Sequence, residues 1–302
     1  MTGKLQQESL YLSVSHHKLH IRHIWQQAGG APVLMLHGAI ENGRIFYTES
    51  GKGLACYLAK QGFNVFVADY RGRGGSEPNL KQDSDHGNYE TITTDIPALM
   101  EHVFERTGQT LHVICHSWGG VLFASSLVRN PRVQALTLSN VCFGTKRQVT
   151  VWGLERLFKV SLIWNRLAPL LTRKTGYLDA KRLGFGSDGE THQSLTQSVQ
   201  WVKKSAWVDP VDGFDYKARA QTIEWPPTWH LTGVKDRVLG HAQDVQLFIA
   251  ETHNSTAEFT LLSKSAGNKR DYDHIDILTT PEAETDHFKA LVIWLHGNEK
   301  NE

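Results

Sequence analysis

The sequence has no long apolar run. No stretch of about 20 apolar residues occurs in it, so nothing predicts a membrane-spanning helix. Residues 1–21 carry polar side chains every few positions and contain no continuous apolar segment. No long run of like charges occurs, and the net charge of +1 favours neither a nucleic-acid surface nor an electrostatic membrane anchor. We therefore expect a cytoplasmic protein with small-molecule partners, with no nucleic-acid partner and no integral membrane segment.

Cysteine is scarce. The three cysteines, Cys56, Cys115 and Cys142, sit in or beside apolar runs at unrelated spacings. This distribution does not fit a disulfide framework or a zinc site, and we expect the three thiols to be buried packing groups. The length of 302 residues and the hydrophobic content of 40% suit one large domain, or a core domain with an insertion.

Short apolar runs alternate with stretches of helical pattern along most of the chain. We expect strands at residues 32–36, 63–68, 110–114, 133–141, 227–233 and 257–262, and helices at residues 54–61, 93–106, 121–128 and 282–295. Residues 10–25 alternate like an antiparallel hairpin with one wet face, so we expect the histidines there to be solvated. The regular alternation predicts an α/β fold with a mainly parallel sheet and helices on both sides.

A short segment of small and polar residues, C-H-S-W-G-G at residues 115–120, separates a predicted strand from a predicted helix. Between a strand and a helix, a pentapeptide of the G-x-S-x-G kind lifts a serine hydroxyl out of the sheet. Ser117 is therefore the candidate nucleophile. Cys115 replaces the leading glycine of the pattern, and its side chain is small enough for the crowded backbone expected there. By itself, a serine between small residues also fits an ordinary turn.

With its flanking strand and helix, this segment resembles the nucleophile elbow of the α/β-hydrolase superfamily. Further matches extend along nearly the whole chain, including H-G-A-I at residues 37–40 and D-Y-R-G-R-G-G-S at residues 69–76. The chain is identified as a serine esterase or lipase-like member with a cap domain. The resemblance implies a mostly parallel eight-stranded sheet, helices on both faces and an inserted helical cap. It implies no metal and no organic cofactor.

The same resemblance implies that the backbone N–H groups of Trp118 and Ala39 form an oxyanion hole, with Ile40 as the second choice after Ala39. Without the elbow, the His-Gly dipeptide is only a turn that ends a strand. The glycine-rich loop with its two arginines also suits phosphate, but no G-K-[ST] follows it and the spacing of a dinucleotide fingerprint is absent. We expect its arginine and aspartate to tie this loop to the sheet.

Two later segments resemble the catalytic acid and base of the superfamily. Residues 233–238, G-V-K-D-R-V, match the pattern G-x-x-D-x-V at the end of the seventh strand, which makes Asp236 the candidate acid. Residues 271–278, D-Y-D-H-I-D-I-L, resemble the histidine loop of lipase-like members, which makes His274 the candidate base. The order Ser117, Asp236, His274 is the chain order of this fold and differs from the trypsin-like and subtilisin-like orders.

The regular pattern stops at residues 144–226, where many aromatic residues are mixed with basic ones. The resemblance places the inserted cap there, and the predicted core then comprises residues 1–143 and 227–302. Amphipathic aromatic side chains suit the wall of a substrate pocket, although most of them also suit packing within the cap. The candidate substrate contacts are Ile40, His116, Trp152 and Trp207. As a candidate base, His116 lacks the position after the last core strand, and a structural role fits it better.

The predicted chemistry is cleavage of a carboxylic ester of a small to medium apolar substrate, through an acyl-enzyme intermediate. A peptidase of the proline-iminopeptidase kind is an alternative, because tryptophan after the nucleophile also occurs there, but the string H-G-G-P-G is absent. Thioester and carbon–carbon bond hydrolysis use the same triad. A hydrolase-fold protein that only binds a small ligand is the non-enzymatic alternative. The presence of all the triad and oxyanion positions weighs against it.

Overall fold

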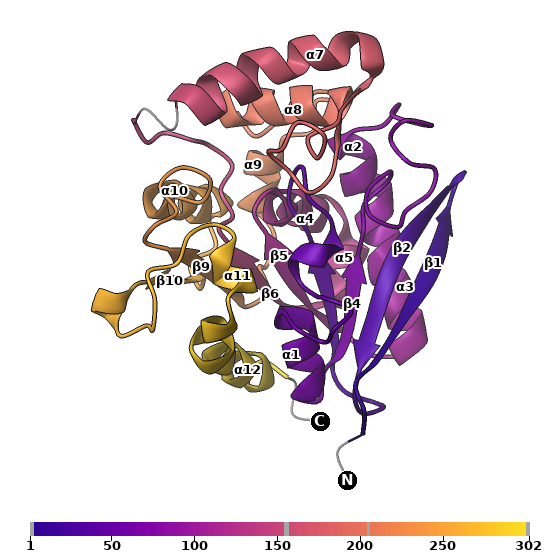
Figure 1. The fold of residues 1–302 in the computed structure, drawn as a ribbon, viewed down its shortest axis with the longest axis vertical. Coiled ribbons are helices and arrows are strands. Elements are labelled where there is room, and N and C mark those ends of the chain that lie inside the picture. The colour runs from indigo at the N-terminus through magenta and orange to yellow at the C-terminus, as the bar shows by residue number, and fades with distance from the viewer. Residues whose placement is uncertain (1–2, 154–156, 204–205, 300–302) are drawn as a thin grey trace.

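An eight-stranded sheet forms the centre of the fold (Figure 1). The structure, a computed structural model, describes residues 3–153, 157–203 and 206–299. The strands are β1 Gln6–Val14, β2 His17–Trp25, β3 Pro32–Leu36, β4 Asn64–Ala68, β5 Leu111–His116, β6 Thr137–Phe143, β9 Thr228–Gly233 and β10 Glu258–Leu262. Their order is β1-β2-β4-β3-β5-β6-β9-β10, with β1 and β2 antiparallel and β4 to β10 parallel. The prediction of a mostly parallel eight-stranded sheet is confirmed.

Helices cover both faces of the sheet, as predicted. One apolar layer packs the sheet against α3 Ile96–Thr107, α4 Trp118–Arg129, α5 Pro131–Leu136 and α10 Ala242–Thr252, and the other packs it against α1 Leu54–Lys60, α11 Asp276–Thr279 and α12 His287–Gly297. Shorter turns are η1 Gly43–Ile45, α2 Asn88–Glu90, η2 Thr91–Asp95, η4 Lys264–Ala266 and η5 Pro281–Thr285. Along β3, Leu34 faces the first layer and Met35 the second, because successive strand residues point to opposite faces. No helix in the described part of the chain is both long and apolar enough to cross a bilayer.

The prediction of a strand from residue 133 is wrong for its first four residues. Residues 131–136 form α5, and β6 begins only at Thr137. The Asn130 side chain accepts hydrogen bonds from the N–H groups of Arg132 and Val133, and Pro131 occupies the first turn, where its missing N–H costs nothing. This capping signal outweighs the apolar pattern that suggested a longer strand.

The hairpin of β1 and β2 is confirmed, but the expectation that its histidines are solvated is wrong for three of them. His17, His20 and His23 are only 2%, 6% and 9% exposed. The His20 ring bonds Asp69 at 2.7 Å and Ser9 at 2.9 Å, and His23 Nε2 lies 2.6 Å from Asn64 Oδ1. The three rings are therefore covered by residues of β1, of β4 and of the loop that follows β4.

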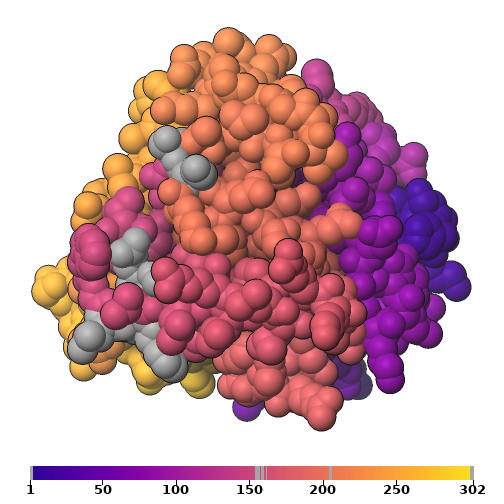
Figure 2. All heavy atoms as spheres, turned by 90° about the horizontal axis from the view of Figure 1, so that it is seen from above, coloured from indigo at the N-terminus to yellow at the C-terminus, as the bar shows by residue number. Residues whose placement is uncertain are grey.

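The segment between β6 and β9 contains the predicted cap, residues 144–226. Its elements are η3 Leu157–Leu167, α7 Ala168–Thr175, β7 Tyr177–Leu178, β8 Glu190–Thr191, α8 His192–Lys203 and α9 Tyr216–Ala220. In Figure 1 the helices α7 and α8 lie above the rest of the fold, and Figure 2 shows atoms of this segment over most of the upper face. A separate small apolar cluster, formed by Leu178, Ala180 and Leu195 with neighbouring residues, holds these helices together. Trp207 instead belongs to the main core, where it packs against Phe248.

The glycine at the end of β9 provides a test of how closely this strand approaches the predicted histidine loop. A methyl group on Gly233 would lie 2.1 Å from the backbone oxygen of Tyr272, which cannot move without shifting the loop. We expect Gly233→Ala to lower the free energy of unfolding by about 1–3 kcal/mol, as overpacking does. Gly297→Ala is the matched control, because its methyl group meets nothing within 4 Å. Equal urea midpoints for the two variants would contradict the close approach.

Candidate active site

The turn between β5 and α4 forces Ser117 into a strained backbone conformation. Its φ of 51° and ψ of −124° lie in a region that residues with a side chain rarely adopt. Gly119 permits the turn to lie against β3, because a methyl group there would come within 2.3 Å of the His37 oxygen. Cys115 is fully buried, with its sulfur 3.8 Å from Asn140 Oδ1. The structure therefore accommodates cysteine at the usual glycine position by placing the side chain in the core.

The three predicted catalytic residues lie together at the carboxyl edge of the sheet. His274 Nε2 is 2.9 Å from Ser117 Oγ, and His274 Nδ1 is 2.5 Å from Asp236 Oδ2. Asp236 follows β9, and His274 lies in the loop after β10. The geometry is that of a serine activated by an imidazole that a carboxylate orients.

The environment of Asp236 favours its charged form. Burial by itself raises the pKa of this carboxyl, but the charge of His274 and its hydrogen bond lower the pKa below the usual value. The N–H of Gly240 donates to Oδ1 at 2.8 Å, and the Lys146 ammonium adds a further attraction. Asp236 therefore stays ionised beside the imidazole, as a group that stabilises a positive His274 must.

Gly144 and Gly240 leave the space that the His274 ring and the Asp236 carboxylate occupy. A methyl group on Gly144, whose φ is +59°, would lie 2.9 Å from two atoms of the His274 ring. A methyl group on Gly240 would lie 2.5 Å from Asp236 Oδ2. The chain therefore needs glycine at both positions to seat the imidazole and the carboxylate.

The loop after β3 lies directly beside Ser117. A methyl group on Gly38 would come within 2.8 Å of the Ser117 Cβ, so the following N–H of Ala39 is close to the nucleophile. Trp118 is the first residue of α4, where helix geometry leaves the N–H without an intrahelical acceptor. The N–H of Ile40, the second choice, instead faces Glu190 Oε2 at 3.3 Å. Within the described residues, the N–H groups of Ala39 and Trp118 have no hydrogen-bond acceptor.

A second histidine–carboxylate pair contacts the backbone of His274, and we call it the Glu41–His116 pair. Glu41 Oε1 accepts hydrogen bonds from the Gly38 N–H and from His116 Nδ1, the latter at 2.6 Å. His116 Nε2 lies 2.9 Å from the backbone oxygen of His274. Although burial opposes both charges, their mutual attraction raises the pKa of His116 and lowers the pKa of Glu41. The pair joins the loop of Ala39 to the backbone of the proposed base.

The four predicted substrate contacts have different positions. His116 uses both ring nitrogens within the protein and is fully buried, so its substrate-contact prediction is corrected to a structural role. Trp207 is also fully buried, and its indole N–H donates to Ser125, which corrects it to a core residue. Trp152 is 89% exposed. Ile40 packs against the small apolar cluster of the cap segment and keeps its prediction.

The loop of residues 69–76 is tied to the sheet by Asp69, which bonds His20 of β2, but its arginines bond other elements. Asp69 accepts hydrogen bonds from the N–H groups of Gly43 at 2.7 Å and Gly75 at 2.9 Å. Arg71 forms a buried ion pair with Asp95, and Arg73 forms one with Glu190. Because both guanidinium groups already have carboxylate partners, the alternative of a phosphate cradle is not supported.

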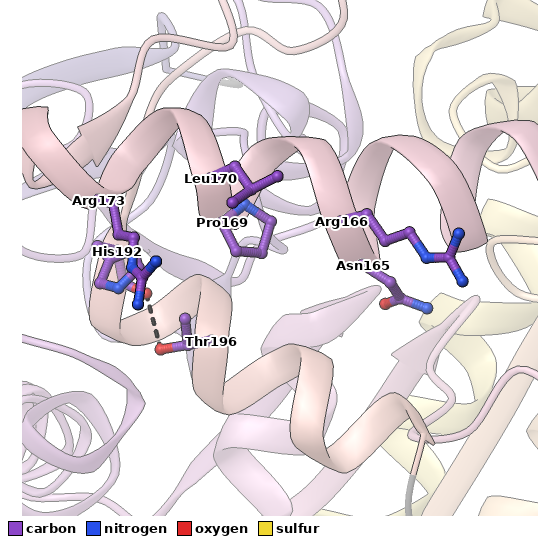
Figure 3. A pocket seen from close by; sticks show the side chains of 7 residues that line it. All are labelled: Asn165, Arg166, Pro169, Leu170, Arg173, His192 and Thr196. Atoms are coloured by element: carbon purple, nitrogen blue, oxygen red, sulfur yellow. Dashed lines mark hydrogen bonds between the residues drawn. The ribbon is translucent and has the colours of Figure 1, made fainter.

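A hollow in the cap segment is separate from the triad. It is lined by Asn165, Arg166, Pro169, Leu170, Arg173, His192 and Thr196. Figure 3 shows that these side chains come from the η3–α7 helix and from the start of α8. None of them belongs to the triad or contacts it, so the hollow is not the site of the predicted chemistry.

Sequence reasoning missed three residues that touch the site: Glu41, Gly144 and Gly240. The sequence contained a signal for Glu41, because this acid stands three residues after Gly38, close to the proposed oxyanion donor, and an acid that is buried there needs a partner. Gly144 follows β6 directly, at the edge where the other site residues lie, but it was assigned to the cap. Gly240 had no neighbouring motif, and only the folded chain shows that its N–H meets Asp236.

The sheet order, the elbow and the order of the site residues are those of an α/β-hydrolase. The chain belongs to the family described as serine aminopeptidase S33, which matches residues 27–265. The identification as an esterase- or lipase-like α/β-hydrolase is confirmed at the level of this superfamily by the relatives described next.

Curated relatives and solved structures are similar to this chain. Sterol esterase 2 of Saccharomyces cerevisiae is 24% identical over 136 residues, which cover 42% of this chain and 25% of that protein. Triacylglycerol lipase 2 of Arabidopsis thaliana is 30% identical over 102 residues, covering 31% of this chain and 24% of that protein. The chain thus matches about a quarter of the length of each.

The fold is similar to that of solved esterases and lipases. A soluble variant of monoglyceride lipase from Saccharomyces cerevisiae has a TM-score of 0.70 at 18% identity, covering 98% of this chain and 96% of that chain. A carboxylesterase from Bacillus subtilis has a TM-score of 0.59 at 15% identity, covering 97% and 92%. At these identities the likeness establishes the fold.

The Glu41–His116 pair predicts a pH window of stability. The lowered pKa of Glu41 means that its contribution is present above about 4.5, its ordinary value, and is lost as the pH falls. The raised pKa of His116 means that its contribution is complete below about 6.5 and is lost as the pH rises through the higher value in the folded state. We expect Glu41→Gln to destabilise the protein most between these two values, measured by urea unfolding from pH 4 to 9. A pH-independent difference would contradict a charged pair.

Proposed function

We propose that the protein hydrolyses carboxylic esters of small to medium apolar substrates with Ser117 as nucleophile, His274 as base and Asp236 as the orienting acid. The observation that carries the proposal is the 2.9 Å contact between His274 Nε2 and a serine held in a strained elbow. A serine that had only a packing role would have no reason to adopt such a backbone conformation.

The mechanism follows from these positions. His274 takes the proton of the Ser117 hydroxyl as its oxygen attacks the carbonyl carbon, and it then returns that proton to the leaving alcohol. Asp236 stabilises the imidazolium and fixes its tautomer. The N–H groups of Trp118 and Ala39 stabilise the oxyanion, each by roughly 3 kcal/mol. Water, deprotonated by His274, hydrolyses the acyl-enzyme and restores the serine.

The apolar character of the substrate is supported by two apolar clusters that include neighbours of the proposed site residues along the chain. Val149 and Val160 of the cap segment form an apolar cluster with Val238, which follows Asp236 by two residues. Ile40, which follows the proposed oxyanion donor Ala39, packs on the apolar cluster that joins α7 to α8. Apolar walls with a few converging polar groups are typical of small-molecule sites.

We further propose that residues 144–226 act as the cap of this site, with residues 1–143 and 227–302 as the core. Within the cap segment, the backbone around residues 186–190 is fixed to the core loops. The N–H groups of Ser187 and Asp188 both donate to the Ile40 oxygen, at 3.0 and 3.1 Å. Asp188 also accepts hydrogen bonds from Asn42 and from the Gly74 N–H.

Aminopeptidase activity is the second candidate, because the family description names it. Such an enzyme needs an acidic group that can bind the free amino terminus of its substrate. The two buried acids nearest the oxyanion loop, Glu41 and Glu190, are already paired with His116 and Arg73. This pairing favours ester hydrolysis over aminopeptidase action.

Ser117→Ala tests the proposed nucleophile. We expect turnover of p-nitrophenyl esters to fall by at least about 10³-fold, since removing a triad nucleophile leaves only binding and the oxyanion hole. Circular dichroism and the urea midpoint should stay near those of the wild type. Ser126→Ala is a control, because it removes a serine hydroxyl that lies in α4 outside the proposed triad, and it should retain activity. Undiminished turnover in Ser117→Ala would refute the assignment.

The choice between ester and peptide substrates needs a direct comparison. We expect measurable kcat/KM on p-nitrophenyl esters from acetate to palmitate, with an optimum at one chain length, and much lower values on aminoacyl p-nitroanilides. A higher kcat/KM on the anilides would favour the aminopeptidase. Labelling of Ser117 by a fluorophosphonate without turnover of either series would show an activated serine with another substrate class.

A further inference from the structure

The turn of the β1–β2 hairpin brings two adjacent histidines next to an aspartate of another loop. His16 Nε2 lies 2.8 Å from Asp83 Oδ2, and His17 Nε2 lies 3.2 Å from the same oxygen. The three ligand atoms all lie within 4.8 Å of one another. None of these residues belongs to the triad, to its hydrogen-bond partners or to the cap segment.

The burial of His17 is the second observation that points to a ligand. Its side chain is only 2% exposed. Among the described residues Nδ1 has no partner, and the 3.2 Å contact of Nε2 with Asp83 Oδ2 does not have hydrogen-bond geometry. A buried polar atom without a partner costs roughly 1–3 kcal/mol, so it calls for an explanation such as an ion. The neighbouring His86 packs edge-on at 5.5 Å between ring centroids and fixes the orientation of the His17 ring.

We propose that His16, His17 and Asp83 bind a divalent transition-metal ion of the zinc class. Imidazole nitrogens with one carboxylate oxygen form the donor set that such ions prefer, and three protein ligands leave a fourth position for water. Two ligand atoms at about 2.0–2.1 Å from one zinc ion lie about 3.3–3.4 Å apart in a tetrahedron. The observed separations of 2.8 and 3.2 Å from Asp83 Oδ2 need only small side-chain adjustments to reach this value.

The surrounding backbone holds the ligands in place. Lys18 and Glu77 exchange two backbone hydrogen bonds, at 2.7 and 2.9 Å, which fasten the hairpin turn to the loop that contains Asp83. The other carboxylate oxygen of Asp83 accepts a hydrogen bond from the Asp85 N–H at 3.0 Å, so Oδ2 is directed to the histidines. His16 is 70% exposed on its side chain and lines an open groove, which gives an ion access from solvent.

The ion would stabilise the loop that contains Asp83, and this loop contacts the cap segment. In Figure 1 this loop, which precedes α2, runs between the tip of the hairpin and α8. Its far end contacts the cap segment, where Thr191 Oγ1 donates to the His86 oxygen at 2.7 Å and Gln193 Nε2 donates to Asp85 at 2.6 Å. The sequence implied no metal for the hydrolytic reaction, and this site is structural and separate from that reaction.

Calorimetric titration of the chelator-treated full chain with Zn²⁺ tests the proposal. We expect one ion per chain, and we expect His16→Ala and Asp83→Asn each to weaken binding by at least about tenfold, a loss that even indirect metal partners cause. His16 is exposed, so its replacement leaves the fold intact. His296→Ala is the matched control, since His296 also contacts a carboxylate, Glu299 at 2.8 Å, but belongs to no group of three possible metal ligands among the described residues. It should bind like the wild type.

Two further measurements make the result decisive. Co²⁺ in place of Zn²⁺ should give the visible absorption of a four-coordinate site in the wild type and not in His16→Ala. Zn²⁺ should raise the thermal midpoint of the wild type and of His296→Ala but not of His16→Ala. The absence of binding in the wild type, or equal binding by the wild type and His16→Ala, would overturn the proposal.

Discussion

Three backbone segments meet around the Ser117–His274 pair at distances that leave no room for a side chain. Gly38 touches the serine, Gly119 touches the backbone of the oxyanion loop, and Gly144 touches the ring of His274. The geometry of the proposed triad therefore depends on backbone packing between the ends of β3, β5 and β6, and not on its three side chains alone. Because protein interiors do not deform continuously, each of these contacts fixes the others.

The site contains two histidine–carboxylate pairs whose rings are 4.7 Å apart. What faces each Nε2 decides the role of the ring. For His274 it is the hydroxyl of Ser117, so the proton can be transferred. For His116 it is the backbone oxygen of His274, so the nitrogen holds the neighbouring loop. A histidine paired with a carboxylate thus has a proposed role in proton transfer in one case and holds a loop in the other.

Much of the fold and of the proposed triad could be predicted because these features are local in sequence. Strands buried on both faces give short apolar runs, and the elbow around Ser117 is contiguous. Long-range contacts could not be predicted in the same way. Trp207 was predicted to contact the substrate, but it lies in the core. There its indole N–H donates to Ser125, which is 82 residues away along the chain. The burial of the hairpin histidines likewise depends on distant partners such as Asp69.

The backbone oxygen of Ile40 is shared by the N–H groups of Ser187 and Asp188. Ile40 itself has a φ of 52°, so its conformation is held against an intrinsic preference for other values. Any motion that lifts residues 187 and 188 must break both hydrogen bonds and release this strain one residue from the Ala39 N–H. Moving residues 187 and 188 away from Ile40 would therefore also change the backbone beside the proposed oxyanion donor, so the proposed cap and the proposed oxyanion hole are coupled through this one residue.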